Sequence, residues 1–345
     1  METTKIGTPS ETSKADELYM RRCLSLALNG EGRVSPNPMV GAVVVCDGRI
    51  IGEGWHRKAG TPHAEVHAIR SVRDESLLRR STIYVSLEPC SHYGKTPPCA
   101  DLIIEKGIPE VVVGCVDSFS AVSGRGIAKL RAAGVRVRVG VLEEECRWLN
   151  RRFFTFHEKG RPYVILKWAQ TGDGSLGEVR SGRPFPLLIS DAADSRTVHK
   201  LRTTEDGILV GVGTVVSDDP SLTARLWPGR QPVRFVVDPS LRIPPEAKVL
   251  TQTAGRTVVL NGVRSGEEGS VKYVKVDFGE GDGVEAILHA VHDEGVQSLI
   301  VEGGAETLRR FLESGQYDET RVFVGGKIVE SGRGIVLRGQ REEQG

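Results

Sequence analysis

Residues 82–99 read TIYVSLEPCSHYGKTPPC and carry most of the information on the fold of the first half of the chain. The apolar run 82–87 predicts a strand, and the loop that follows it is rich in Pro and Gly. A helix is predicted next, from about Pro98 to Lys106, and then a strand over 110–116. Strands that alternate with helices are typical of an α/β domain with three layers.

The flanking sequence continues this alternation, and it assigns residues 13–157 to one domain after a polar, unstructured tail, 1–12. Asp47-Gly48 predicts a hairpin turn, and Thr61-Pro62 predicts the N-cap and first residue of a helix. The expected elements are a helix from Ser13 to about Gly30, strands 40–46 and 49–54, a helix from Pro62 to about Arg73, a helix over 124–133, a strand over 135–139 and a helix over 142–158.

A second α/β domain is predicted over residues 163–330, after a linker at 158–162. The stretch GVGTVVSDDP, residues 211–220, is predicted to be a loop. The expected strands are 163–169, 207–210, 233–238, 257–260, 271–276, 297–301 and 321–324, and the expected helices are 191–202, 283–294 and 305–313.

Composition excludes several classes of protein. The 345 residues hold 46 basic and 45 acidic side chains, a net charge of +1, so no nucleic-acid partner is expected. No apolar run approaches the ~18 residues of a membrane span, and the polar N-terminus does not resemble a secretory signal. Six Cys are too few for a disulfide scaffold, which predicts a reducing, cytoplasmic setting.

Three residues with zinc-binding side chains occur near the opening stretch. They are His63, in His63-Ala64-Glu65, and the pair Cys90 and Cys99, each of which is expected at the start of a loop or helix. One His and two thiolates suit Zn²⁺ and leave a fourth ligand position for water. Zinc lowers the pKa of bound water from 15.7 to about 7, and Glu65 is placed to carry the proton of that water to a leaving amine. H-x-E followed by P-C and a second Cys is the signature of zinc-dependent deaminases.

A closed structural zinc site, with His67 or His92 as fourth ligand, is the alternative at these positions. A zinc protease is excluded, because its motif needs Glu directly after the first His. The remaining cysteines lie in apolar stretches and are expected to be inert core residues: Cys23, Cys46, Cys115 and Cys146.

The second half carries features typical of a site for a phosphorylated ligand. Gly303-Gly304 lies between a predicted strand and helix, where backbone amides and the helix dipole can hold a phosphate. Gly211-Val212-Gly213-Thr214 follows another strand, with Asp218 about one turn later. Arg202 and Arg225 flank this region, and a guanidinium can bind a phosphate with two hydrogen bonds. The alternative is that the glycines are turns and the arginines are surface charges. No G-x-G-x-x-G follows a strand, so a Rossmann cofactor site is not expected.

The spacing of the two cysteines separates this chain from most nucleobase deaminases, whose pair is C-x-x-C, because here eight residues intervene. With this long loop, the chain closely resembles the bifunctional deaminase/reductases of riboflavin biosynthesis over roughly residues 15–325. The motifs that carry the resemblance are SPNPMVGAVVV at 35–45, GEGWH at 52–56, HAEVHA at 63–68, LEPCSHYGKTPPC at 87–99, VSGRG at 122–126, LKWAQTGDG at 166–174, VGVGTVVSDDPSLTAR at 210–225 and VEGG at 301–304.

The resemblance implies a cytidine-deaminase-like N-terminal domain that removes an amine from a phosphoribosylated diaminopyrimidinone. It implies that His63, Cys90 and Cys99 bind one zinc ion per chain and that Glu65 is the proton shuttle. Polar positions expected around the deaminase substrate are Asn37, His56, His92 and Lys95.

For the second half, the resemblance implies a dihydrofolate-reductase-like α/β domain that uses NADPH to reduce the ribosyl group of the deaminated product to ribityl. It places NADPH against Thr214, Asp218, Gly303 and Gly304. It places the substrate near Arg202, Leu222, Arg225 and Glu302.

Two stretches of the reductase half differ from the family pattern. The family commonly has Trp-Ile-Thr near the nicotinamide, whereas residues 186–190 read PLLIS. From Gly325 the chain reads GGKIVESGRGIVLRGQREEQG, which predicts a domain shorter by one strand and its loop. An unpaired sheet edge favours a partner that covers it, so we expect a homo-oligomer. Because the binding motifs of this half are intact, we expect a working reductase, but one that the short end makes less stable. The alternative is a deaminase that carries a degenerate reductase domain.

A nucleic-acid editing deaminase with an accessory RNA-binding domain is the competing hypothesis, because its zinc site would look similar. The net charge of +1 and the absence of a basic, aromatic stripe favour a small-molecule substrate instead. A zinc-stabilised scaffold without catalysis is the third possibility, and it would deaminate nothing.

Overall fold

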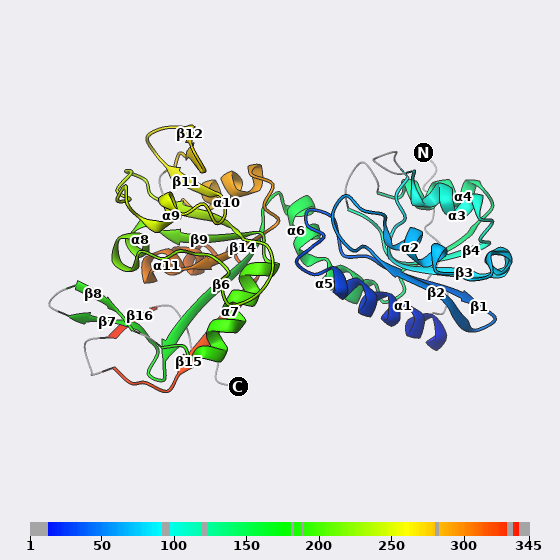
Figure 1. Ribbon diagram of the computed structural model, residues 1–345, viewed down its shortest axis with the longest axis horizontal. Helices are drawn as coiled ribbons and strands as arrows, with labels where there is room; N and C mark the ends of the chain where they lie inside the picture. The colour runs from blue at the N-terminus through cyan, green and yellow to red at the C-terminus, as the bar shows by residue number, and fades with distance from the viewer. Residues whose placement is uncertain are drawn as a thin grey trace, which may run out of the picture. The chain divides into compact units, whose positions relative to one another are not determined.

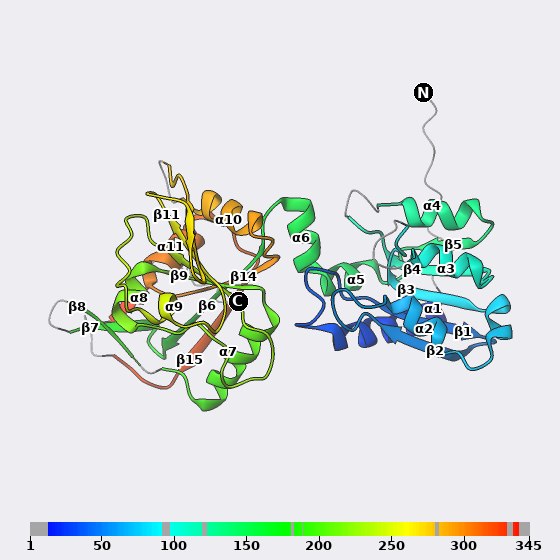
Figure 2. The same cartoon turned by 45° about the horizontal axis from the view of Figure 1, so that its top comes forward.

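The computed structural model of the chain describes residues 13–91, 97–118, 123–180, 183–187, 189–279, 283–329 and 334–337. The chain forms two compact units that divide between Glu158 and Lys159 (Figures 1 and 2). Both units combine helices with sheets, so the predicted α/β class is confirmed. Within the described ranges, no helix has the length and apolar character needed to cross a membrane.

A five-stranded sheet with the order β2-β1-β3-β4-β5 forms the centre of the first unit. Its strands are β1 (Gly41–Cys46), β2 (Arg49–Trp55), β3 (Thr82–Leu87), β4 (Glu110–Cys115) and β5 (Arg136–Val139). Strand β1 pairs antiparallel with β2 and β3, and β3, β4 and β5 run parallel. The inner strands are nearly continuous apolar runs because helices cover both faces of the sheet.

The helices of this unit are α1 (Lys14–Ala27), α2 (Ala64–Arg70), α3 (Cys99–Glu105), α4 (Arg125–Ala132), α5 (Glu143–Leu149) and α6 (Arg151–Lys159), and short 3₁₀ turns cover Leu28–Gly30 and Glu75–Arg80. Helices α2, α3 and α4 bury Ile69, Ile103 and Leu130 against one face of the sheet. Helices α1 and α5 bury Met20 and Cys146 against the other face (Figure 1). The three-layer α/β/α arrangement predicted for this half is therefore confirmed.

Two helix boundaries in this unit differ from the prediction. Helix α2 begins at Ala64 with His63 as N-cap, because the Thr61 hydroxyl donates to the Lys58 carbonyl oxygen instead of capping a helix. The helix predicted over 142–158 is divided at Asn150, which leaves helical geometry with φ −102° and ψ 23°. The Asn150 amide exchanges two hydrogen bonds with the backbone of Met39, of 2.8 and 2.9 Å. These contacts with a distant segment account for the break.

An eight-stranded sheet forms the second unit, in the order β12-β13-β11-β10-β9-β14-β6-β15. Its strands are β6 (Tyr163–Thr171), β9 (Gly207–Gly211), β10 (Val233–Val237), β11 (Thr257–Asn261), β12 (Gly266–Glu268), β13 (Val271–Lys275), β14 (Ser298–Glu302) and β15 (Glu319–Gly325). All neighbours pair parallel except β12 with β13. Strand β15 is the outermost strand beside β6, so it forms one edge of the described sheet.

Helices cover both faces of this sheet as well, and they are α7 (Ala192–Thr204), α8 (Val212–Asp218), α9 (Lys248–Thr251), α10 (Val284–Asp293) and α11 (Ala305–Ser314). Helices α10 and α11 pack Leu288 and Phe311 into one apolar core. Helices α7, α8 and α9 pack Leu201, Val215 and Val249 into the other (Figure 2). The carboxyl ends of the parallel strands thus meet at one edge, where ligands bind in open α/β sheets.

Helix α8 occupies most of the segment predicted to be a loop, residues 211–220, so that prediction is wrong. Gly211 is its extended N-cap, and Val212 and Val215 are buried beneath it. A small antiparallel sheet was not predicted; it consists of β7 (Ser175–Arg180), β8 (Arg183–Pro186) and β16 (Gly334–Val336). These strands are short and contain Gly, Pro and charged residues, so the sequence does not show a clear alternation of apolar and polar positions.

A buried ion pair ties the first helix of the chain to the sheet. The Asp16 carboxylate accepts hydrogen bonds of 2.6 and 2.9 Å from the Arg138 guanidinium and 2.7 Å from the Tyr84 hydroxyl. The hydrogen bond from Arg138 outweighs burial and holds the pKa of Asp16 well below its usual range. The charged form of Asp16 is therefore more stable in the folded chain than in the unfolded chain.

We expect Asp16→Asn to lower the free energy of unfolding of the first unit by about 2 kcal/mol at neutral pH. Because the folded pKa lies below the unfolded value of about 3.9, the contribution is complete above that value and is lost as the pH falls below it. Urea unfolding of the parent and variant chains at a series of pH values checks this. A difference between the two chains that does not shrink on acidification would contradict it.

Candidate functional site

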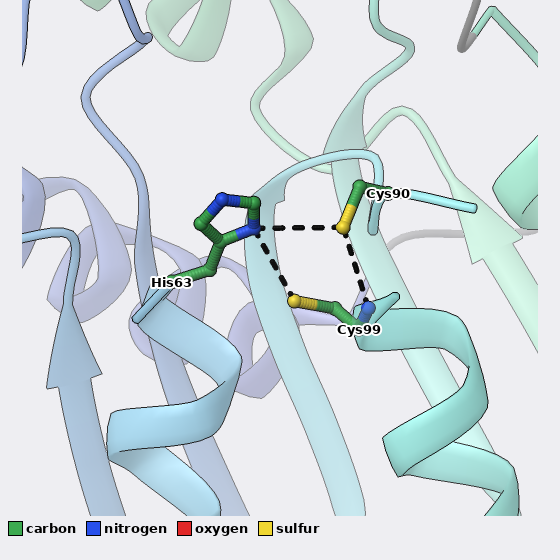
Figure 3. A group of neighbouring side chains, drawn as sticks. All are labelled: His63, Cys90 and Cys99. Atoms are coloured by element: carbon green, nitrogen blue, oxygen red, sulfur yellow. Dashed lines mark hydrogen bonds between the residues drawn. The ribbon is translucent and has the colours of Figure 1, made fainter. Parts of the chain in front are cut away.

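Three elements bring the predicted zinc ligands together in the first unit. His63 is the N-cap of α2, Cys90 follows β3 after Glu88-Pro89, and Cys99 is the first residue of α3. Figure 3 shows the two sulfur atoms and the imidazole directed toward one point. The Nδ1 atom of His63 lies 3.5 Å from Cys90 Sγ and 3.4 Å from Cys99 Sγ.

These distances fit a zinc ion. Tetrahedral bonds of 2.0–2.1 Å to nitrogen and 2.3 Å to sulfur place neighbouring nitrogen and sulfur ligands about 3.6 Å apart. Among the described residues, His67 does not join His63, Cys90 and Cys99 in the group whose ligand atoms lie within 4.8 Å of one another. His67 as fourth ligand of a closed site is therefore not supported, and His92 lies outside the described residues.

The local hydrogen bonds favour a thiolate in this group. The backbone N–H of Cys99 donates to Cys90 Sγ at 3.3 Å, at the start of α3. Hydrogen bonds from Cys99 and His63, against the effect of burial, lower the pKa of Cys90 to about 4, and the hydrogen bond with Cys90 raises the pKa of His63 to about 9. A preformed thiolate is the state that binds a metal cation.

Glu65 lies in the first turn of α2, two residues after the N-cap, and is only 3% exposed. Burial raises the pKa of its carboxyl to about 7, and the side chain shares a hydrogen bond with the thiol of Cys99. A carboxyl group in contact with a ligand of the cluster is in the position that a proton carrier needs.

Two of the predicted substrate positions lie beside the cluster. The Asn37 amide contacts His56 Nε2 at 3.1 Å, and His56 Nδ1 lies 3.2 Å from the Pro62 carbonyl oxygen. Since that carbonyl can only accept, Nδ1 donates and Nε2 accepts from Asn37. The His56 and His63 rings meet edge to face with 5.3 Å between centroids. His92 and Lys95, the other two predicted positions, lie outside the described residues.

Glu88 anchors the Cys90 segment and was not singled out from the sequence. Its buried carboxylate accepts backbone N–H groups of Gly124 at 2.9 Å and Gly126 at 2.8 Å, and of Asp117 and Ile127 at 3.3 and 3.2 Å. A Cβ atom at Gly126 would come within 1.9 Å of the Pro89 carbonyl oxygen, so this contact requires glycine. The end of β3 is thus held against the start of α4, where β4 also ends.

In the second unit, Thr214 on α8 meets the turn between β14 and α11. Its hydroxyl accepts the backbone N–H of Gly304 at 2.8 Å. Gly303 has φ +131°, a geometry that favours glycine, and a Cβ there would lie 3.1 Å from the Thr214 hydroxyl. Asp218, four residues after Thr214, is exposed at the end of α8 and accepts from Ser217. Three of the four predicted NADPH positions therefore come together, and Asp218 lies one helical turn away.

The predicted substrate residues Arg202 and Glu302 form a buried ion pair with each other. Arg202 Nη2 lies 2.7 Å from Glu302 Oε2, and Lys167 Nζ lies 4.0 Å from the same oxygen. Burial would raise the pKa of Glu302, but the charges of Arg202 and Lys167 outweigh it and lower the pKa to about 2. Arg202 also donates to the Thr223 carbonyl oxygen at 3.1 Å. Its guanidinium thus has partners inside the protein.

The two other predicted substrate residues lie on the segment after α8. Leu222 has φ +53°, and its side chain is buried in the apolar core beneath α7 and α8. Arg225 is exposed, and its guanidinium donates to the Thr223 hydroxyl at 2.9 Å. Of the two predicted phosphate-binding arginines, Arg225 is the one directed to the surface.

Two residues with roles in these sites were not predicted from the sequence: Glu88 and Lys167. Both lie within motifs quoted for the family resemblance, LEPC and LKWAQ, so that signal could have found them. Asn150, which sets a helix boundary, contacts Met39 at a distance of 111 residues along the chain, and no local pattern marks such a contact. The four cysteines expected in the core, at 23, 46, 115 and 146, are buried as predicted.

Comparison with known proteins gives matches in both units. The family model described as "Cytidine and deoxycytidylate deaminase zinc-binding region" matches residues 13–115, and the one described as "RibD C-terminal domain" matches residues 162–343. The "Riboflavin biosynthesis protein RibD" of Aquifex aeolicus is 44% identical, over 93% of this chain and 89% of that protein. The protein of the same name from Bacillus amyloliquefaciens is 39% identical, over 92% and 87%.

Two solved structures match most of the chain, through both units. A diaminohydroxyphosphoribosylaminopyrimidine deaminase/5-amino-6-(5-phosphoribosylamino)uracil reductase from Thermotoga maritima aligns with a TM-score of 0.84 at 40% identity, covering 95% of this chain and 92% of that one. RibD of Acinetobacter baumannii aligns with a TM-score of 0.84 at 31% identity, covering 96% and 92%. Since the similarity runs through both units, the chain belongs to the RibD family of bifunctional riboflavin biosynthesis enzymes, a deaminase followed by a reductase.

Proposed function

We propose that the first unit removes an amino group by hydrolysis from 2,5-diamino-6-(5-phosphoribosylamino)pyrimidin-4-one, and that the second unit uses NADPH to reduce the ribosyl group of the product to ribityl. The observation that carries the proposal is the group of His63, Cys90 and Cys99, with Glu65 against it, in a chain whose second unit is of the reductase type. The deaminase and reductase activities for which the Thermotoga maritima protein is named support both reactions.

In the deaminase unit, His63, Cys90 and Cys99 would hold zinc, which activates water for attack on the pyrimidine carbon that bears the amine. Glu65 takes a proton from the attacking water and delivers it to the leaving amine, so that ammonia departs. Asn37 and His56, joined by their hydrogen bond, face the cluster and bind the pyrimidine edge. His92 and Lys95 complete the substrate contacts in this proposal.

In the reductase unit, Arg225 binds the substrate phosphate, and the backbone of Leu222 contributes to the same site. Arg202 and Glu302, held together by their ion pair, complete the substrate contacts in this proposal. Thr214, Asp218, Gly303 and Gly304 bind NADPH. NADPH held there would supply the hydride for the ribosyl C1′, the bond from C1′ to the ring oxygen would open, and a proton on that oxygen would complete the ribityl chain.

We place the protein in the cytoplasm, because zinc binding needs reduced thiols at Cys90 and Cys99 and all six cysteines are free in the structure. We further propose a homo-oligomer in which a partner covers the exposed edge strand β15, which carries the exposed Val322 and Val324.

The proposal is tested by incubating the zinc-loaded chain with the diaminopyrimidinone, with and without NADPH, and identifying the products by mass. We expect the deaminated ribosyl compound without NADPH and the ribityl compound with it. Deamination without reduction would leave a deaminase with a degenerate reductase domain. Deamination of RNA or free cytidine in preference to this substrate would overturn the proposal.

We expect Arg202→Ala to destabilise the second unit, because it leaves the Glu302 carboxylate buried without its closest cation. Breaking a buried ion pair from one side costs about 3–5 kcal/mol in the free energy of unfolding. The matched control is Arg225→Gln, an exposed change that should alter stability by less than ~0.5 kcal/mol but raise the KM for the substrate. Chemical denaturation and NADPH oxidation distinguish the two. An Arg202→Ala chain as stable as the parent, with only KM raised, would assign the phosphate to Arg202 instead.

A further inference from the structure

The segment from Leu222 to Leu226 is irregular, yet much of its backbone is buried. Thr223 is 3% exposed and Ala224 7%. Side chains therefore satisfy its backbone polar groups. Gln231, seven residues further along the chain, accepts the N–H of Ala224 at 2.8 Å and donates to its carbonyl oxygen at 2.9 Å. The geometry of this loop depends on such side-chain contacts.

His199, on α7, makes the contact nearest to the exposed arginine. Its Nδ1 atom accepts the backbone N–H of Arg225 at 2.7 Å and that of Leu226 at 3.4 Å. An imidazole nitrogen that accepts carries no proton, so the proton of the neutral ring is on Nε2. His199 is buried, 6% exposed, and its two hydrogen bonds hold the ring and the backbone of Arg225 and Leu226 in one arrangement.

Four charged groups surround the His199 imidazole, and they belong to the helix, the loop and the two strands beside it. They are Arg202 on α7, Arg225 in the loop, Lys167 on β6 and Glu302 on β14. Burial lowers the pKa of His199, and the three cations lower it further against the single carboxylate of Glu302. At neutral pH the ring is therefore uncharged and free to accept both hydrogen bonds.

We propose that His199 is a positioning residue of the reductase, which holds the backbone of Arg225 so that its guanidinium faces the substrate phosphate. The inference rests on the proposed function for the part played by Arg225. The positioning role follows from the geometry of the Arg225 side chain. Its guanidinium is exposed, and it donates to Thr223, in the same loop. Its direction is thus set by the backbone that His199 holds.

Two variants separate the acceptor from the bulk of the ring. In His199→Asn the side-chain oxygen takes nearly the place of Nδ1 and can accept the same N–H groups, whereas His199→Leu keeps the volume and has no acceptor. We expect His199→Leu to raise the KM for the deaminated phosphoribosyl substrate about tenfold. The kcat, the KM for NADPH and the rate of ammonia release should stay near their parental values. Asn should restore the substrate KM to within about twofold of the parent.

The pH profile gives a readout that a purely structural role would not change. Protonation of Nδ1 would replace the acceptor with a donor facing two N–H groups, so the parental KM should rise on acidification. Because the pKa of His199 is lowered, this rise begins below the ordinary imidazole pKa of about 6.5. The Asn side chain does not titrate. The substrate phosphate, with a second pKa near ~6, is common to both chains, so the parent-to-Asn ratio of KM isolates the effect of His199.

Amide hydrogen exchange measures the same contact without catalysis. The N–H groups of Arg225 and Leu226 should exchange faster in the Leu variant and at the parental rate in the Asn variant. A Leu variant with unchanged KM and exchange, or an Asn variant as impaired as Leu, would overturn the inference. If the His199→Leu chain fails to fold, a ratio of parental KM to His199→Asn KM that does not change with pH overturns the inference. A parent chain that never oxidises NADPH refutes the proposed function instead, and the exchange rates then decide on His199.

Discussion

Glu65→Gln lowers the rate of ammonia release by about 10²–10⁴-fold, the usual contribution of a general acid–base group, while the zinc content stays at the parental level. Gln is nearly isosteric with Glu and fits the buried position in α2, but it cannot accept the proton of the attacking water. Ammonia release and metal content, measured on the same preparation, check both halves of this expectation.

Reduction supplies the internal control for Glu65→Gln. NADPH oxidation with the deaminated substrate added directly should proceed at the parental rate, because Glu65 belongs to the other compact unit. A variant that releases ammonia as fast as the parent would assign the proton transfer to another residue. A variant that loses zinc as well would place Glu65 among the groups that hold the cluster together.

Cys99→Ala is expected to abolish zinc retention and, with it, deamination. Only three side chains of the described residues form the cluster, and a metal held by so few protein ligands does not tolerate the loss of one thiolate. Metal analysis after dialysis, together with ammonia release, measures this. NADPH-dependent reduction of the deaminated substrate should continue.

Cys46→Ala is the matched control, since Cys46 is also a buried cysteine of the first unit but lies on β1, outside the cluster. It should keep zinc and deaminate at a rate close to the parental one. Full zinc occupancy in Cys99→Ala would remove that residue from the ligand set.

The sequence was sufficient to predict the grouping of His63, Cys90 and Cys99, because the features that mark these residues are local. His63 and Cys99 lie at helix starts, and Cys90 follows a strand that is mostly apolar and buried. Each feature is visible within a few residues, and the order of the three is a signature. The α/β class follows in the same way from the alternation of apolar runs.

Features set by distant contacts could not be predicted in this way. The break at Asn150 depends on Met39, 111 residues away, and the pairing of Arg202 with Glu302 spans 100 residues. Helix α8 was expected to be a loop because its Gly-rich start outweighed the short apolar spacing of Val212 and Val215. Tertiary packing determines these three features, and a short stretch of sequence carries no information about it.

The anchoring of Glu88 has a consequence for how this protein can vary. All four groups that bind its carboxylate are main-chain N–H groups, so the anchor does not depend on which side chains positions 117 and 127 carry. Mutational tolerance is thus divided unevenly, because one acidic side chain carries the whole interaction, whereas the side chains at positions 117 and 127 take no part in it. Substitutions at those two positions would leave the anchoring hydrogen bonds in place. The vulnerable positions would be Glu88, Gly124, whose φ of +72° favours glycine, and Gly126, where the approach of Pro89 leaves no room for a side chain.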